Sequence, residues 1–147
     1  MVDERVFRHS YPVEGGDFSH AGEVSCQMKN LLKEMGVNGQ ILRRAAIASF
    51  EAEMNVIMYA ASGTVELTVT PEEIRISIVD EGPGIPDIEL AMTEGYSTAT
   101  AEMRELGFGA GMGLPNIKKN SDTFRLQSKP GLGTWLEFTI RRNGAGP

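Results

Sequence analysis

The chain has one cysteine, two histidines and no long hydrophobic run. A single Cys26 among 147 residues cannot form an internal disulfide, so we expect it to be a small buried apolar residue in a reducing compartment. No apolar stretch approaches the ~20 residues that a bilayer-spanning helix needs, and the first residues lack the basic-then-apolar order of a secretory signal. We therefore expect a cytoplasmic protein that binds no membrane.

Concentrated positive charge is also missing. The formal net charge is −6, and the 14 lysines and arginines are scattered apart from pairs at 43–44, 118–119 and 141–142. A surface that tracks nucleic acid needs a basic patch or stripe, because lysine and arginine neutralise the phosphates. Direct binding to DNA or RNA is therefore not expected.

The chain does have enough apolar material for one core. Hydrophobic residues make up 41% of the 147 residues, and a chain of this size buries roughly two-thirds of its unfolded surface on folding. No internal repeat or low-complexity segment divides it. We predict a single domain over residues 1–147.

The first sixty residues predict one strand and two long helices. Residues 4–13 alternate loosely and contain Pro12, which only an edge strand tolerates. Apolar residues then recur at helical spacing in two segments, the first capped by Asp17 or Ser19 and the second by Asn38. The predicted elements are an edge strand over 4–13, a helix over about 19–35 and a largely buried helix over about 39–61.

The remainder predicts two hairpins separated by a long irregular segment. Residues 63–80 are rich in β-branched residues around a turn that Pro71 opens. Residues 86–110 lose all periodicity, which in a compact domain is typical of a lid or binding segment. A helix over 111–122 and a second hairpin over 123–142 follow. Paired strands separated by helices indicate an α+β fold, a two-layer sandwich in which helices cover one face of a mostly antiparallel sheet.

A carboxylate and an amide share one face of the buried helix. Glu51 and Asn55 are four residues apart and so stack on one another, whereas Glu53 points about 200° away and is expected in solvent. A carboxylate can take a proton from an attacking hydroxyl, and an amide oxygen can hold a magnesium ion that phosphates and water otherwise coordinate. The alternative is a solvated stripe shared with Arg44.

Two glycine-rich stretches follow. In "VDEGPGIPD", Asp80 ends a strand, where it can accept a hydrogen bond from an exocyclic amine such as that of adenine, and Gly82 and Gly84 let a flat ring approach. An ordinary reverse turn also explains these residues. In "GFGAGMG", residues 107–113, alternating glycines precede a helix whose positive end favours phosphate. A flexible linker is the competing interpretation.

In combination these stretches resemble a known family. "EAEMN" at 51–55, "DEGPGIPD" at 80–87, "GFGAGMGL" at 107–114 and "GLGT" at 131–134 look like the four nucleotide-binding boxes of the GHKL ATPases. The resemblance covers about residues 40–140. Within the family, the short length and the "GYST" and "GMGLPNIK" stretches are most similar to bacterial anti-sigma-factor serine/threonine kinases and to the switch kinases of stress-signalling modules.

The resemblance implies a Bergerat sandwich, with a mixed sheet under about three helices, and a kinase that uses ATP and Mg²⁺. Its substrate would be a small anti-sigma-antagonist protein, and a sigma factor or another regulator would be a second partner. Glu51 would be the general base and Asn55 the magnesium ligand. Nucleotide contacts would come from Asn55, Asp80, Gly82, Gly84, Ile85, Ser97, Thr98, Gly109, Ala110, Gly111, Met112, Gly113, Leu114 and Thr134.

One departure from the family leaves alternatives open. Several anti-sigma kinases have a basic residue where this chain has Gly109, and the nearest cation is Arg104. One alternative is a nucleotide-gated module that captures a regulator without efficient turnover. Another is a stand-alone catalytic domain of the histidine-kinase type, although His9 and His20 are expected to be ordinary surface or packing residues. The apolar first helix could also serve a homodimer.

Overall fold

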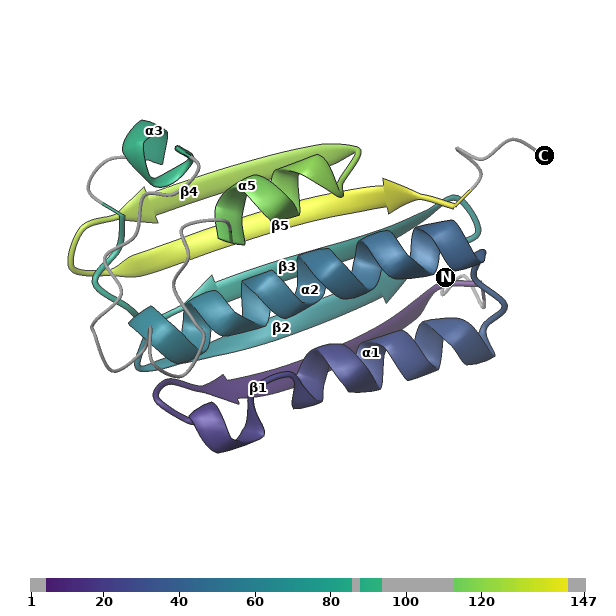
Figure 1. Cartoon of the computed structure of the whole chain (residues 1–147), viewed down its shortest axis with the longest axis horizontal. Coiled ribbons are helices and arrows are strands. Elements are labelled where there is room, and N and C mark those ends of the chain that lie inside the picture. The colour runs from purple at the N-terminus through teal and green to yellow at the C-terminus, as the bar shows by residue number, and fades with distance from the viewer. Residues whose placement is uncertain (1–4, 86–87, 94–112, 143–147) are drawn as a thin grey trace.

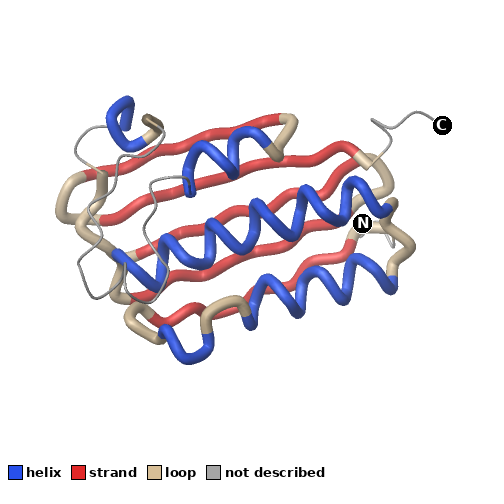
Figure 2. Tube along the Cα trace, in the orientation of Figure 1, coloured by secondary structure: helices blue, strands red, loops and turns tan. Residues whose placement is uncertain are grey.

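The computed structural model describes residues 5–85, 88–93 and 113–142. Within them, five strands form one sheet, and three helices, α1, α2 and α5, lie side by side across one of its faces (Figure 1; Figure 2). The elements are β1 (Phe7–Glu14), the 3-10 helix η1 (Phe18–His20), α1 (Glu23–Glu34), α2 (Gly39–Tyr59), β2 (Ser62–Val69), β3 (Glu73–Asp80), α3 (Ile88–Ala91), α5 (Gly113–Lys119), β4 (Thr123–Lys129) and β5 (Gly133–Arg141).

The strand order is β1-β2-β3-β5-β4, and every neighbouring pair is antiparallel. The predicted two-layer α+β sandwich, its two hairpins and the edge position of the first strand are therefore confirmed. The mixed sheet that the family resemblance implied is corrected, since all four pairings of the described strands run antiparallel. Strands joined by short hairpins pair in this way because the chain returns beside itself without a crossover.

The core lies between this sheet and the three helices. Alternate residues of each inner strand are buried, as a period of two requires for a sheet covered on one face only. One row crosses four strands, where Leu67 pairs with Ile76, Ile76 with Phe138, and Phe138 with Phe124. Leu67, Ile76 and Phe138 are fully buried, so this row anchors α2 over the middle of the sheet.

The second predicted helix cap is confirmed and the first is wrong. Asn38 accepts a hydrogen bond from the Gln40 backbone N–H and begins α2. Asp17 precedes only the short η1 and makes no side-chain cap bond. Helix α1 begins at Glu23, after Gly22, so the predicted helix over 19–35 divides into a 3-10 turn and a separate α-helix.

One expectation about α1 also needs correction. Cys26 is exposed instead of buried, because α1 turns Ser25, Met28 and Leu32 into the protein and Cys26 lies off that face. Met28 and Leu32, two of the apolar residues of this helix, are about 1% exposed inside this chain. These two side chains of α1 therefore belong to the core of the protein itself, and a homodimer through α1 stays a prediction.

The expectation for the two histidines is confirmed. His9 is exposed on β1 and makes ring contacts with Phe7 and Tyr11, and His20 is exposed and hydrogen-bonded to Asp17. Across the described parts of the chain, no helix combines the length and the apolar character that crossing a bilayer requires.

Candidate functional site

Glu51 and Asn55 converge on the first residue of α5. Both are partly buried on α2, and their side chains meet Gly113: a Cβ placed there would lie 3.2 Å from Glu51 Oε2 and 3.3 Å from Asn55 Oδ1. Any side chain at residue 113 would fill the space into which the two oxygens project. Glycine thus allows α5 to begin directly beside the carboxylate and the amide.

The environment of Glu51 favours its protonated form. Burial raises the pKa of the Glu51 carboxyl above its ordinary value, because a charged carboxylate loses hydration in a partly buried site. Arg44 lies elsewhere, since its guanidinium donates to the Asn120 carbonyl at 3.2 Å and to Asp122 Oδ1 at 3.3 Å. These contacts direct Arg44 toward the β4 side of the molecule and argue against a charged stripe that it shares with Glu51.

Asp80 occupies the end of β3, opposite Thr134 of β5. The Thr134 backbone N–H donates to Asp80 Oδ1 at 3.1 Å, and the Gly82 backbone donates to the same carboxylate. Burial raises the pKa of Asp80, and the two backbone hydrogen bonds oppose that shift. A carboxylate has about four acceptor positions, so two backbone donors leave it able to bind a further amine.

Ser128 is a residue of this corner that the sequence analysis missed. It pairs with Thr134 across the β4–β5 hairpin, and its Oγ lies 3.0 Å from Thr134 Oγ1. The same Oγ accepts the Ile85 backbone N–H at 2.6 Å and donates to the Gly133 carbonyl at 3.1 Å. Hairpin register could have placed Ser128 opposite Thr134, but its contact with Ile85 depends on the tertiary fold.

Gly84 is held against the turn of the same hairpin. Its φ is +78°, and a Cβ there would lie 2.5 Å from the Lys129 carbonyl oxygen. The Gly131 backbone N–H also donates to the Pro83 carbonyl at 2.7 Å. The backbone of this corner therefore packs on the protein's own hairpin, which accounts for glycine at 84 without reference to a ligand.

The expectation for Glu53 is wrong. Its side chain does leave α2 on the side opposite Glu51, but that side is covered by α1, and Glu53 is only 1% exposed. Its carboxylate accepts hydrogen bonds from the backbone N–H groups of Gly22, Val24 and Ser25. Periodicity gave the direction of the side chain and could not show which neighbour lies there.

Several residues of the predicted site fall outside the described ranges, namely Ser97, Thr98, Gly109, Ala110, Gly111 and Met112. Leu114 follows Gly113 in α5 and packs against the core. Among the residues that the structure describes, no group of three His, Cys, Asp or Glu side chains could hold a metal ion. A magnesium ion here would depend on Asn55 together with phosphate and water oxygens, which is the usual way that Mg²⁺ binds beside a nucleotide.

The chain is similar to several known proteins. The family described as histidine kinase-, DNA gyrase B-, and HSP90-like ATPase matches residues 29–144. The serine/threonine-protein kinase RsbT of Bacillus subtilis is 33% identical over 113 residues, which cover 74% of this chain and 79% of that protein. The anti-sigma F factor of Caldanaerobacter subterraneus subsp. tengcongensis is 34% identical over 100 residues, 63% of this chain and 66% of that protein.

A solved structure shares the fold. The crystal structure of the SiaB-SiaC complex from Pseudomonas aeruginosa contains a chain that superposes with a TM-score of 0.64, covering 93% of this chain and 90% of that one. The sequence identity is 14%, so this similarity concerns the arrangement of the helices and the sheet.

Proposed function

The chain belongs to the histidine kinase-, DNA gyrase B- and HSP90-like ATPases, and on that premise we propose that it is a serine/threonine protein kinase of a bacterial partner-switching system. It transfers the γ-phosphoryl group of ATP to a hydroxyl of a small antagonist protein. Similarity to a serine/threonine-protein kinase and to an anti-sigma F factor supports this choice within the family. A sigma factor or another regulator is the second partner in the proposal.

The observation that carries the proposal is the convergence of Glu51 and Asn55 on Gly113. We assign Glu51 as the general base that takes the proton of the attacking Ser or Thr hydroxyl. Burial raises the pKa of Glu51, which strengthens it as a base near neutral pH, where an ordinary glutamate is weak. Asn55 Oδ1, one helical turn away, is the assigned magnesium ligand.

Asp80 provides the proposed adenine site. Thr134 and Gly82 hold its carboxylate in place, and a free acceptor position can take the exocyclic amine of the base. Bound Mg-ATP supplies the phosphoryl group and the charge neutralisation for its transfer. The chain's own contribution is to orient the nucleotide between β3 and α2 and to accept one proton at Glu51.

Replacement of Glu51 by Gln tests the kinase. The variant keeps the shape of the side chain but cannot accept the proton, so we expect label transfer from ATP to the proposed antagonist protein to fall about 100-fold or more. Affinity for Mg-ATP should stay within about threefold, measured by calorimetry. Glu66→Gln, on the exposed face of β2, is the matched control and should transfer label at the wild-type rate.

The second candidate is a module in which ATP controls the capture of a regulator without turnover. The similarity to an anti-sigma F factor supports binding to a sigma factor as part of the function. The same assays separate the two candidates: if wild-type protein binds ATP and the partner but transfers no label, the kinase assignment is rejected and the binding module is retained.

A further inference from the structure

We propose that Glu53 is a positioning residue for the phosphoryl-transfer site, because it ties the turn of α2 that carries Glu51 and Asn55 to the start of α1. The inference rests on the proposed function, since it concerns how accurately that site is built. Glu53 itself faces away from the site. Its role would be to hold α2 at one rotation and one height relative to the rest of the domain.

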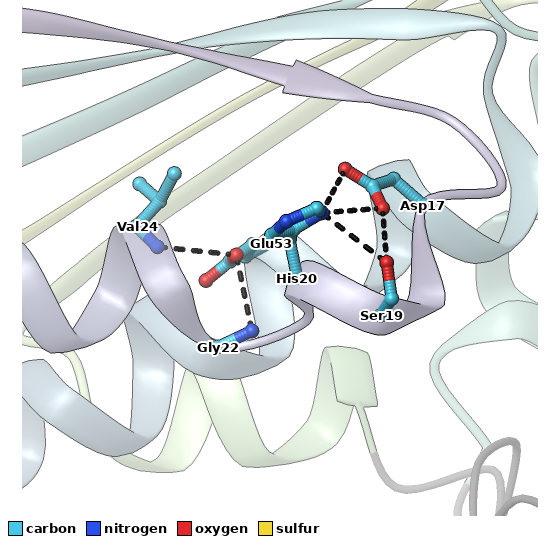
Figure 3. A network of polar contacts seen from close by, with 6 residues as sticks. All are labelled: Asp17, Ser19, His20, Gly22, Val24 and Glu53. Carbon is cyan, nitrogen blue, oxygen red and sulfur yellow. Dashed lines mark hydrogen bonds and ion pairs between the residues drawn. The ribbon is translucent and has the colours of Figure 1, made fainter.

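The contacts of Glu53 are unusually complete for a buried carboxylate. Oε2 accepts the backbone N–H groups of Gly22 at 3.1 Å and Val24 at 3.3 Å, and Oε1 accepts that of Ser25 at 2.9 Å. Figure 3 shows the carboxylate pointing from α2 at the start of α1, beside the Asp17–His20 pair. Only 1% of Glu53 is exposed, so the hydrogen-bond partners of its carboxylate are these protein groups and hardly water.

Helix α1 has no local side chain to perform this task. The first N–H groups of any helix have no partner within the helix, and a neighbouring Ser, Thr, Asp or Asn usually supplies one. Here the residue before α1 is Gly22, and no side-chain cap bond is present. Glu53, which is 28 residues after Ser25 in the chain, replaces that cap. It also lies at the positive end of the α1 dipole.

This arrangement makes movement of α2 costly. If α2 rotated or slid against α1, a buried carboxylate and three backbone donors would lose their partners together, and unpartnered buried polar groups are strongly unfavourable. The packing of apolar residues alone would resist such a movement less, because it has no single preferred direction. Glu53 therefore fixes the rotation of α2 at the height of the site.

The rotation matters because Glu51 lies on the opposite side of the same turn. Side chains extend about 6 Å from a helix axis, so a rotation of only ~10° displaces the Glu51 carboxylate by about 1 Å. A displacement of ~1 Å in a catalytic group can reduce the rate about 100-fold. Asn55, one turn along, would move with it, while the Asp80–Thr134 corner belongs to the sheet and would stay in place.

The test begins with Glu53→Gln. The glutamine oxygen can accept the Gly22 and Val24 N–H groups. Its amide nitrogen then faces the Ser25 N–H, so two donors oppose each other and Ser25 loses its acceptor. We expect kcat for phosphoryl transfer to fall about 10- to 100-fold, with a smaller rise in KM for Mg-ATP. Glu53→Asp keeps the charge and shortens the side chain, and it carries the same test if Glu53→Gln does not fold.

Leu32→Ala is the matched control for stability. Leu32 is fully buried on the same helix pair, near the far end of α1, and its truncation weakens the α1–α2 packing without touching the site turn. At a temperature where all variants are folded, we expect its kcat within about twofold of wild type. Wild-type kcat in Glu53→Gln, or an equal loss of kcat in Leu32→Ala, would overturn the proposal.

A second measurement separates this inference from the kinase assignment. Calorimetry gives the affinity for ATP with Mg²⁺ and with chelator, and the ratio reports what Mg²⁺ adds to binding, to which Asn55 contributes as the proposed ligand. We expect Glu53→Gln to reduce that ratio about threefold or more and to leave the affinity in chelator unchanged. If the wild type transfers no label and Glu53→Gln still lowers the ratio, the kinase assignment is refuted and the positioning role is retained. An unchanged ratio would refute the positioning role.

Discussion

Gly113→Ala should separate the stability of the fold from the accuracy of its site. The added methyl group would lie 3.2 Å from Glu51 Oε2 and 3.3 Å from Asn55 Oδ1, so both side chains must retreat by a few tenths of an ångström. Since ~1 Å costs about 100-fold in rate, a retreat of about 0.3 Å corresponds to about a fourfold loss. We therefore expect kcat for phosphoryl transfer to fall about three- to tenfold.

Stability should respond in the other direction. Alanine is favoured over glycine in a helix by about 0.5–1 kcal/mol, and for a domain of this size that corresponds to a Tm about 1–4 °C higher. The strain falls on the ends of two movable side chains, so we expect Tm to be unchanged or raised. Circular dichroism on heating measures Tm, and transfer of labelled phosphate measures kcat on the same samples.

Gly39→Ala is the matched control for this variant. Gly39 is likewise the first residue of a helix, and a Cβ there would meet nothing within 4 Å. It should raise Tm by a similar amount and leave transfer unchanged. Wild-type transfer in Gly113→Ala would show that Glu51 and Asn55 do not act together at Gly113, and a fall in Tm above ~5 °C would show that the backbone, not the two side chains, absorbs the methyl group.

Two further predictions concern the carboxylate and the hairpin corner. Burial raises the folded-state pKa of Glu51, so the stability linked to its protonated form is present below the ordinary pKa and is lost as pH rises through the folded value. The unfolding free energy of Glu51→Gln relative to that of wild type should therefore increase as the pH rises from the ordinary glutamate pKa of about 4.3 through the folded value. Urea titration measures this difference, and a difference that stays constant with pH would contradict the reasoning. Ser128→Ala removes the acceptor for Ile85 N–H and the donor to the Gly133 carbonyl, and we expect ATP affinity to fall about three- to tenfold by calorimetry. Unchanged affinity would mean that Thr134 and Asp80 hold the corner without Ser128.

Local patterns were sufficient for most elements of the fold. The period of two in β2, β3 and β5 and the helical spacing around Asn38 each follow from backbone geometry, which sets the direction of successive side chains. The one-turn separation of Glu51 and Asn55 has the same origin, and the structure places both side chains together at Gly113. The glycine-rich stretch over 107–112 lies outside the described residues, so its predicted phosphate contacts stay a prediction.

The sequence by itself determined which residues are apolar, roughly where most helices and strands lie, and that Glu51 and Asn55 share one face of α2. Only the tertiary structure decided what covers the other face. Glu53 was expected in solvent and is buried against α1, and Ser128 reaches Ile85 across 43 positions of the chain. The physical reason is that a helical period sets the direction of a side chain, whereas its burial and hydrogen-bond partners depend on which distant segment packs there.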